Sequence, residues 1–196
     1  MNLPEPVRGA EDVARRGAEV RVAEHGSFGD HVADRFSDRL DAGERLARRL
    51  ERYARGPDVI VLALPRGGVP VGYPIARRLG AELDVLVVRK LGMPRRPELA
   101  MGAIGPGGVR VLQPGVPGTM GVSAADLDAV TARERAELTR RERAYRGGRA
   151  PPGLAGRRAI LVDDGVATGS TMLAAIDVAR RLGAAELILA IPVAPA

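Results

Sequence analysis

The sequence predicts an α/β fold in which a Rossmann-like parallel sheet is flanked by helices. The first observation is a set of four short apolar runs, at residues 59–64, 83–88, 159–162 and 187–193. Such continuous apolar runs are typical of parallel strands that are buried on both faces. The second observation is that helical patterns alternate with these runs, which favours a parallel sheet. Ligands of such sheets bind beyond the carboxyl ends of the strands.

Each predicted helix has a recognisable beginning or end. The helices are expected at residues 37–54, 70–79, 123–145 and 171–182. Glycine follows three of them, at Gly56, Gly80 and Gly183, because glycine readily ends a helix. Ser123 and Asp126 resemble a capping box at the start of the longest one.

The remaining segments are expected to form loops, one hairpin and a tail. Residues 1–34 have no clear periodicity and indicate a poorly ordered tail, so that residues 35–196 make up the domain. Residues 89–99 have a loop-like composition. Two short strands, 101–104 and 109–113, are expected to pair as a hairpin through four Gly and Pro residues. Further loops are expected at residues 114–121 and 147–156.

Composition excludes several classes of protein. The chain has 196 residues and no cysteine, so disulfide frameworks and thiolate chemistry are excluded. No apolar run reaches membrane-spanning length and no signal-like segment opens the chain, so a cytoplasmic protein without a membrane partner is expected. The net charge of +6 favours anionic ligands, and Lys90 is the only lysine. Aromatic residues are too few for a nucleic-acid stacking platform.

The most informative run is Ile-Leu-Val-Asp-Asp-Gly-Val-Ala-Thr-Gly-Ser-Thr, at residues 160–171. A buried strand ends in two adjacent carboxylates, Asp163 and Asp164, and a loop of small residues then leads into a helix. The loop amides and the helix N-terminus can bind an anion, with hydroxyl side chains as further donors. The carboxylates can accept hydrogen bonds from sugar hydroxyls or hold waters on a metal ion. This order predicts a site for a sugar that carries a phosphate.

The same run resembles the 5-phosphoribosyl-1-pyrophosphate (PRPP) motif of the type I phosphoribosyltransferases. That motif has apolar residues, two acids, small or apolar residues and then Thr-Gly-x-Thr; Gly165 departs from it, since many members have a branched apolar residue there. The resemblance implies that the acid pair, Asp163 and Asp164, holds the ribose hydroxyls and, through water, Mg²⁺, and that this pair and Lys90 are catalytic. The residues implied to hold the 5-phosphate are Val166, Ala167, Thr168, Gly169, Ser170 and Thr171.

Two other segments resemble parts of the same family. Residues 65–68, Pro-Arg-Gly-Gly, resemble the pyrophosphate loop after the first core strand. The pair Arg89-Lys90 resembles the basic pair that leads into a mobile loop, which here would be residues 91–112. The residues implied to hold the pyrophosphate are Arg66, Gly67, Gly68, Arg89 and Lys90. Together with Pro97-Glu-Leu-Ala-Met-Gly-Ala-Ile, these stretches are similar to a bacterial group of predicted phosphoribosyltransferases.

The resemblance implies a reaction and its partners. The phosphoribosyl group of PRPP would pass to a nucleobase-like acceptor with release of pyrophosphate, in the presence of Mg²⁺. The transition state would resemble an oxocarbenium ion, as at other glycosidic centres. The protein would position the reactants, stabilise the leaving group and exclude water. A homodimer is one option for the assembly.

The sequence leaves alternatives open. Family members usually continue beyond the strand at residues 187–193, so the domain is expected to be truncated at its C-terminus. A PRPP-binding regulator that contacts RNA through the arginine-rich helix at residues 123–145 is one alternative to a transferase. An inactive interaction module is another. A dinucleotide-binding dehydrogenase is disfavoured because the expected glycine fingerprint is missing from the strand ends.

Overall fold

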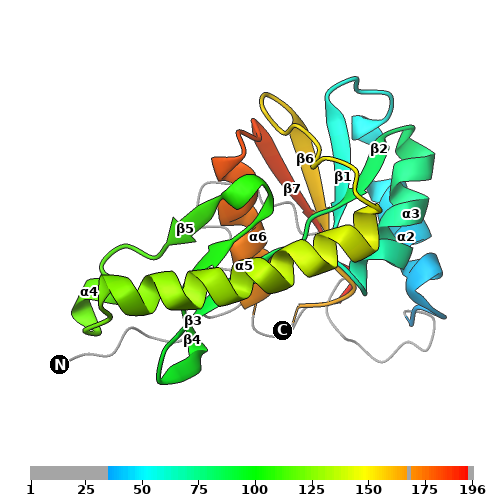
Figure 1. Ribbon diagram of the computed structural model, residues 1–196. Coiled ribbons are helices and arrows are strands. Elements are labelled where there is room, and N and C mark those ends of the chain that lie inside the picture. The colour runs from blue at the N-terminus through cyan, green and yellow to red at the C-terminus, as the bar shows by residue number, and fades with distance from the viewer. Residues whose placement is uncertain (1–34, 167–168, 194–196) are drawn as a thin grey trace.

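The core of the protein is a parallel sheet of four strands in the order β2-β1-β6-β7. The computed structural model describes residues 35–166 and 169–193. The strands are β1 (Val59–Ala63), β2 (Glu82–Val85), β6 (Arg158–Val162) and β7 (Glu186–Ala190), and every adjacent pair is parallel (Figure 1). The α/β fold with helices on both faces is therefore confirmed. The tail predicted for residues 1–34 lies outside the described residues.

Successive residues of each central strand enter different layers of the core. In β1, Val59 and Val61 pack with α2 (Arg39–Arg49) and α3 (Gly68–Leu79), whereas Ile60 and Leu62 pack with α6 (Ser170–Arg181). This alternation is the ordinary pleat of a strand, and both faces here are covered by helices. It explains why the strands are continuous apolar runs in the sequence.

Helix α2 lies against α3 at very short range. Asp38 caps α2 by accepting hydrogen bonds from the N–H groups of Leu40 and Asp41, at 2.8 and 2.9 Å. A Cβ atom built on Gly43 would lie 2.4 Å from the carbonyl oxygen of Val71. Only glycine permits this approach, so the position of α2 on α3 is fixed by backbone contact.

A second, antiparallel sheet forms the other part of the molecule. Its strands are β3 (Arg89–Met93), β4 (Arg96–Ile104) and β5 (Arg110–Leu112), in that order. The hairpin is confirmed as β4 and β5, joined by a 3-10 turn, η3 (Pro106–Gly108). The prediction of a loop at residues 89–99 is wrong, because this segment is folded as strands of the sheet, whereas the mobility of residues 91–112 stays a prediction.

The glycine and proline residues of this segment led to the wrong prediction of a loop. The register between β3 and β4 shifts at Gly92, and a Cβ atom there would lie 2.4 Å from the carbonyl oxygen of Pro97. Gly92 therefore marks a bulge with a close approach of two strands. Leu91 and Met101 are fully buried in a hydrophobic cluster of their own, which stabilises the sheet.

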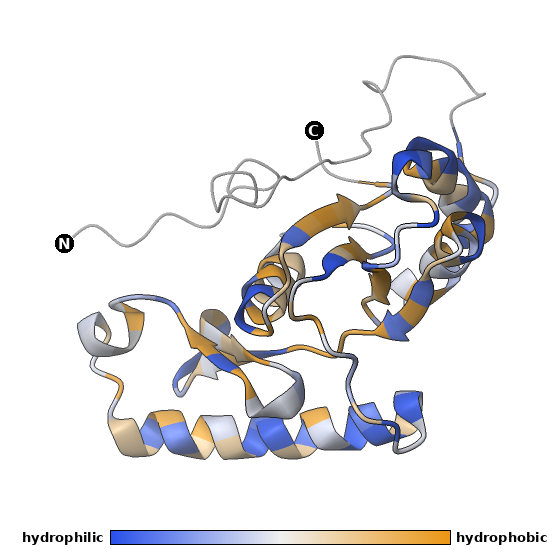
Figure 2. Ribbon diagram, turned by 90° about the horizontal axis from the view of Figure 1, so that it is seen from above, coloured by the Kyte–Doolittle hydropathy of each residue, from blue (hydrophilic) through white to orange (hydrophobic). Residues whose placement is uncertain are grey.

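The long helix α5 (Ala124–Arg146) covers the small sheet. It runs along one side of this sheet in Figure 2, and its Val130 and Leu138 are buried in the same cluster as Leu91. The opposite side of the sheet faces α6, so that α6 lies between the two sheets. A one-turn helix, α4 (Val116–Thr119), replaces part of the loop predicted at residues 114–121, and a second 3-10 turn, η2 (Glu51–Tyr53), follows α2.

Some predicted element ends differ from the structure by a few residues. The second strand, β2, ends at Val85, yet Leu86 and Val87 remain buried on the way to the small sheet. The last strand, β7, ends at Ala190 rather than at residue 193. Within the described ranges, no helix has the length and apolar character required to cross a bilayer.

A buried ion pair attaches the end of α5 to the parallel sheet. Arg146 donates from Nη1 to Oδ1 of Asp84 at 2.7 Å, and the two side chains are only 2% and 9% exposed. Arg146 also donates to backbone carbonyl groups of Val85 and Ala150. This single guanidinium thus holds a helix terminus, a strand and a connecting segment together.

We expect Arg146→Ala to lower the free energy of unfolding by about 3–5 kcal/mol, because it leaves the buried carboxylate of Asp84 unpaired. Urea unfolding followed by circular dichroism measures this change. Arg143→Ala, at an exposed position of the same helix, is the matched control and should stay within about 0.5 kcal/mol of the parent. Equal stabilities of the two variants would show that the ion pair does not hold α5 in place.

Candidate functional site

The candidate site lies at the carboxyl ends of β1 and β6, which are neighbours in the middle of the parallel sheet. The chain leaves β1 through α3 to β2 on one side, and it leaves β6 through α6 to β7 on the other side. The ends of β1 and β6 therefore flank the point at which the sheet changes direction, where open α/β sheets bind ligands. The backbone N–H of Leu64 donates to the carbonyl of Val162 at 2.8 Å, so the two loops begin side by side.

The loop after β1 lies directly on the loop after β6. A Cβ atom on Gly67 would lie 2.2 Å from Oδ2 of Asp164, and one on Gly68 would lie 2.3 Å from the carbonyl oxygen of Val162. Neither distance leaves room for a side chain. The two glycines predicted for pyrophosphate binding thus also bring the backbone of their loop against the acid pair. The peptide bond between Pro65 and Arg66 in this loop is cis.

The acid pair is partly buried. Oδ1 of Asp163 accepts a hydrogen bond from the backbone N–H of Asp164 at 2.9 Å. Burial raises the pKa of Asp163 to about 6, and the neighbouring Asp164 carboxylate adds to the rise. The site therefore holds more negative charge than its surroundings readily stabilise, and a bound cation would relieve this.

Arg39, the first residue of α2, supplies one such cation. Its Nε donates to Oδ2 of Asp164 at 2.8 Å, and its Nη2 lies 2.7 Å from the same oxygen. Arg39 is not among the site residues predicted from the sequence. Local pattern carries no signal for it, because its partner is 125 residues away in the chain.

The acid pair fits a magnesium ion that is shared with a phosphorylated ligand. Among the described residues, no cluster of three or more His, Cys, Asp or Glu side chains could enclose a metal ion by itself. Mg²⁺ usually binds through one or two carboxylates, with waters and substrate phosphates as the other ligands. Asp163 and Asp164 provide that smaller set of oxygens, and their mutual repulsion favours a divalent cation.

The segment predicted to hold the 5-phosphate, residues 166–171, is called the phosphate loop here. It leads into the N-terminus of α6. Gly169 has a φ of 71° and precedes Ser170, the first residue of the helix, and its carbonyl accepts from the N–H of Leu173 at 2.8 Å. The N–H groups in the first turn of a helix lack carbonyl partners within the helix and suit an anion. The N–H of Val166, by contrast, already donates to the carbonyl of Val193 at 3.0 Å. Ala167 and Thr168 lie outside the described residues.

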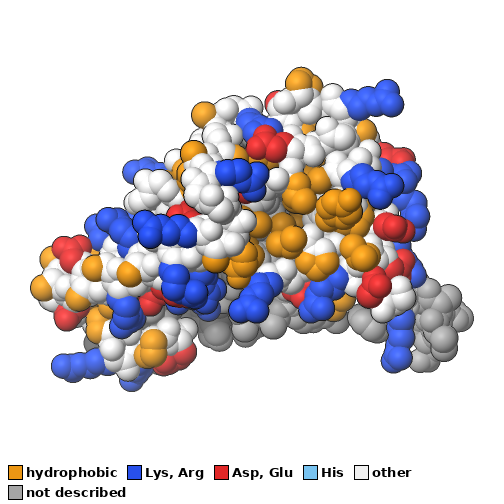
Figure 3. Space-filling view, turned by 45° about the vertical axis from the view of Figure 1, so that its right-hand side comes forward, with side chains coloured by type: hydrophobic (Ala, Val, Ile, Leu, Met, Phe, Trp, Pro, Cys, Tyr) orange, Lys and Arg blue, Asp and Glu red, His pale blue; other side chains and the backbone are white. Residues whose placement is uncertain are grey.

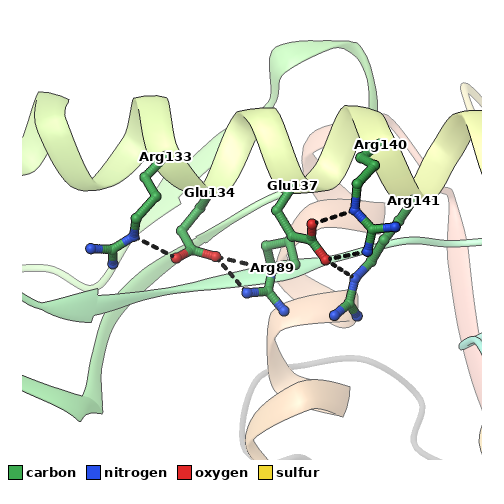
Figure 4. A network of polar contacts seen from close by, with 6 residues as sticks. All are labelled: Arg89, Arg133, Glu134, Glu137, Arg140 and Arg141. Carbon is green, nitrogen blue, oxygen red and sulfur yellow. Dashed lines mark hydrogen bonds and ion pairs between the residues drawn. The ribbon is translucent and has the colours of Figure 1, made fainter.

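The two basic residues at the start of β3 face different neighbours. Lys90 donates from Nζ to Oγ of Ser170 at 3.1 Å, and this contact brings the small sheet to the phosphate loop. Arg89 donates from Nε and Nη2 to Oε2 of Glu134 on α5, at 3.0 and 2.7 Å (Figure 4). Consecutive side chains of a strand point to opposite faces, so Arg89 and Lys90 cannot both face one ligand.

The geometry therefore supports only part of the predicted pyrophosphate set. Arg66 is exposed on its loop, Gly67 and Gly68 lie against the acid pair, and Lys90 reaches the phosphate loop. Arg89 is held by Glu134, whose side chain is only 12% exposed, and Arg133 is a second partner of that carboxylate. Arg89 thus attaches β3 to α5, and this arrangement does not support a direct role in the site.

The raised pKa of Asp163 predicts that this residue lowers stability at neutral pH. The folded protein binds a proton at Asp163 more readily than the unfolded chain does, for which 3.8 is the ordinary value. Stability is therefore lost as pH rises from about 4 to about 6. Asp163→Asn should raise the free energy of unfolding at pH 7.5 by on the order of 1–2 kcal/mol, with no gain at pH 4.

Urea unfolding at both pH values measures this difference. Asn keeps an acceptor oxygen for the N–H of Asp164, so the change removes charge with little loss of hydrogen bonding. Glu44→Gln, at an exposed position of α2, is the control and should change stability equally little at both pH values. A loss of stability in Asp163→Asn at pH 7.5 would contradict the predicted repulsion.

Comparison with known proteins identifies the family. The model of the phosphoribosyl transferase domain matches residues 33–196. Two Mycobacterium tuberculosis proteins, from strains CDC 1551 and H37Rv, have provisional names as phosphoribosyl transferases and are each 53% identical over 160 residues. The match covers 82% of this chain but 36% of theirs, so the chain spans about a third of the length of these curated relatives.

A solved structure supports the same assignment. The crystal structure of TT1426 from Thermus thermophilus is 45% identical and superposes with a TM-score of 0.74. The match covers 82% of this chain and 76% of that one. With the family model matching most of the chain and the acid pair placed at the switch point of the sheet, the protein belongs to the type I phosphoribosyltransferase family.

Proposed function

We propose that the protein transfers the 5-phosphoribosyl group of PRPP to a nucleobase-like acceptor, with release of pyrophosphate and dependence on Mg²⁺. One observation carries the proposal: the acid pair at the end of β6 lies against the glycine loop after β1 and precedes the N-terminus of α6. This arrangement supports adjacent sites for a diphosphate, for ribose hydroxyls and for a 5-phosphate. The family assignment supports phosphoribosyl transfer as the reaction class.

Different residues of the site would bind different parts of the ligand. The 5-phosphate would bind the first turn of α6 and the hydroxyls of Ser170 and Thr171, where the helix N-terminus favours an anion. The ribose hydroxyls would donate to Asp163 and Asp164. The diphosphate would lie on the loop that contains Arg66, and bound Mg²⁺ would supply charge neutralisation between the diphosphate and the acid pair.

The chemical step needs little covalent participation by the protein. The bond between C1 of the ribose and the diphosphate oxygen would break, with its electron pair leaving on the diphosphate. A bond between C1 and a nitrogen of the acceptor would form, and the proton of that nitrogen would pass to solvent. Positive charge would develop at the ribose, close to the carboxylates, while the diphosphate would gain negative charge that Arg66 stabilises. The site positions both reactants and excludes water from the reactive carbon.

The regulatory alternative receives less support from the structure. Its RNA surface would be the exposed arginines of α5. Three of these arginines are engaged with carboxylates of the same helix: Arg133, Arg140 and Arg141. Glu137 alone binds two of them, as Figure 4 shows, and this neutralises part of the charge that RNA would need.

Assembly and cellular location remain predictions. On the face in Figure 3, apolar side chains gather in a patch among charged ones. Tyr73 of α3 is 53% exposed, the highest value among the large apolar side chains of the described residues. Exposed apolar surface of this kind is typical of protein interfaces and supports the homodimer option. A cytoplasmic location is likewise an expectation from the sequence.

The proposal predicts saturable, Mg²⁺-dependent binding of PRPP to this chain, measured by titration calorimetry. Asp163→Asn and Asp164→Asn should each weaken binding by about tenfold or more, because each removes a charged acceptor from the ribose and the cation. For Asp163→Asn this loss should accompany a gain in stability. Asp128→Asn, at an exposed position of α5, is the control and should bind as the parent does.

Pyrophosphate release in the presence of a panel of purine and pyrimidine bases then tests transfer itself. Release that requires both PRPP and one of the bases would identify the acceptor. A folded chain that does not bind PRPP, or variants of the acid pair that bind it as tightly as the parent, would refute the proposed function.

A further inference from the structure

Arg39 stands out because it reaches the site from an element that the predicted mechanism does not use. It belongs to α2, on the side of the sheet opposite α6, yet its guanidinium contacts Asp164 through two nitrogens. Its side chain remains 61% exposed, whereas that of Asp164 is 30% exposed. A guanidinium has five N–H donors, and only Nε and one Nη are directed at this carboxylate.

The position of Arg39 is fixed by the fold rather than by its own flexible side chain. Asp38, the residue before it, caps α2 and sets where the helix begins. Gly43, one turn further on, holds α2 against the backbone of α3. Because α3 begins in the glycine loop itself, at Gly68, Arg39 and that loop belong to one packed unit.

Asp164 places the guanidinium at the diphosphate end of the site. The oxygen that accepts from Arg39, Oδ2 of Asp164, is the same atom that lies 2.2 Å from the Cβ position of Gly67. The guanidinium is therefore next to the pyrophosphate loop. Lys90 lies elsewhere, at Ser170 and the phosphate loop, and so marks the other end of the ligand.

A diphosphate carries several negative charges. In the structure, fewer basic side chains lie near its proposed site than the sequence predicts. Arg89 is held by Glu134 on α5, and Lys90 contacts the phosphate loop. Of the three basic residues predicted for the pyrophosphate, Arg66 alone lies on its loop. A second arginine at that loop would restore the balance of charge, and guanidinium groups bind phosphate oxygens with two parallel hydrogen bonds.

We propose that Arg39 binds the diphosphate of the ligand, in the place that the sequence analysis gave to Arg89. This inference rests on the proposed function of the site. Arg39 neutralises Asp164 in the ligand-free protein and donates its remaining N–H groups to a diphosphate oxygen when PRPP or pyrophosphate binds. The N-terminal helix α2 is then part of the substrate site and not only a cover for the sheet.

The experiment compares Arg39→Gln, Arg39→Lys and the parent chain by titration calorimetry with three probes. These are Mg²⁺ with pyrophosphate, Mg²⁺ with PRPP, and ribose 5-phosphate, which lacks the diphosphate. Arg48→Gln, at an exposed position of the same helix, is the matched control for loss of one positive charge. Thermal unfolding of each variant shows that it is folded.

Arg39→Gln should weaken the binding of pyrophosphate and of PRPP by about tenfold or more. It should leave the affinity for ribose 5-phosphate within about twofold of that of the parent. Arg39→Lys should lose less, because a lysine keeps the charge without the paired donors. Arg48→Gln should bind all three probes as the parent does.

Three outcomes would overturn the inference. Pyrophosphate affinity equal to that of Arg48→Gln would show that Arg39 does not contact the diphosphate. An equal loss for ribose 5-phosphate would show that Arg39 acts only by positioning Asp164. A parent chain that binds neither pyrophosphate nor PRPP would refute the proposed function itself, and the inference with it.

Discussion

The close approach of the glycine loop after β1 to the loop after β6 determines how the site is built. Gly67 and Gly68 bring the loop after β1 against Asp164 and the carbonyl of Val162. The parallel pairing of β1 and β6 aligns the two loops, and the crossover connections place them at the point where the sheet changes direction. Helices α3 and α6 begin just beyond these loops, so their N-termini are directed by the same contact. A change in the distance between the loops would therefore displace the ligand-binding groups proposed on both of them.

Much of the fold follows from local patterns in the sequence. The continuous apolar runs correctly predicted β1, β6 and β7, because strands covered on both faces have no polar side to show. The run at residues 160–171 predicted the acid pair and the helix after it. The patterns gave a wrong prediction at residues 89–99. Gly92 and two prolines there indicate a loop, but they belong to a pair of strands with a bulge. Burial of Leu91 against α5 decides that structure, and no local window contains both partners.

The same limit applies to the site. The residues on the loops after β1 and β6 were predicted because each loop carries a short motif of its own. Arg39 and Glu134 could not be predicted in this way, since each acts on a residue at least 45 positions away. Adjacent charged residues in the sequence do not always share a ligand. Arg89 and Lys90 are consecutive, but the pleat of β3 directs Arg89 to α5 and Lys90 to the phosphate loop. Resemblance identifies the residue types of a site, whereas the fold decides which of them face the ligand.

The absence of space at Gly67 also has an evolutionary consequence. Any side chain at this position would overlap the carboxylate of Asp164, so it is accepted only where Asp164 moves out of the site or is replaced by a smaller residue. Once both changes have occurred, restoring the aspartate alone would produce a clash with the new side chain. Recovery would then require two reversions in a fixed order, because the glycine must return before the aspartate, and the first of them restores no binding group. A lineage that loses both residues would therefore regain its acid pair less readily than one that keeps the glycine, in which a single substitution restores the aspartate.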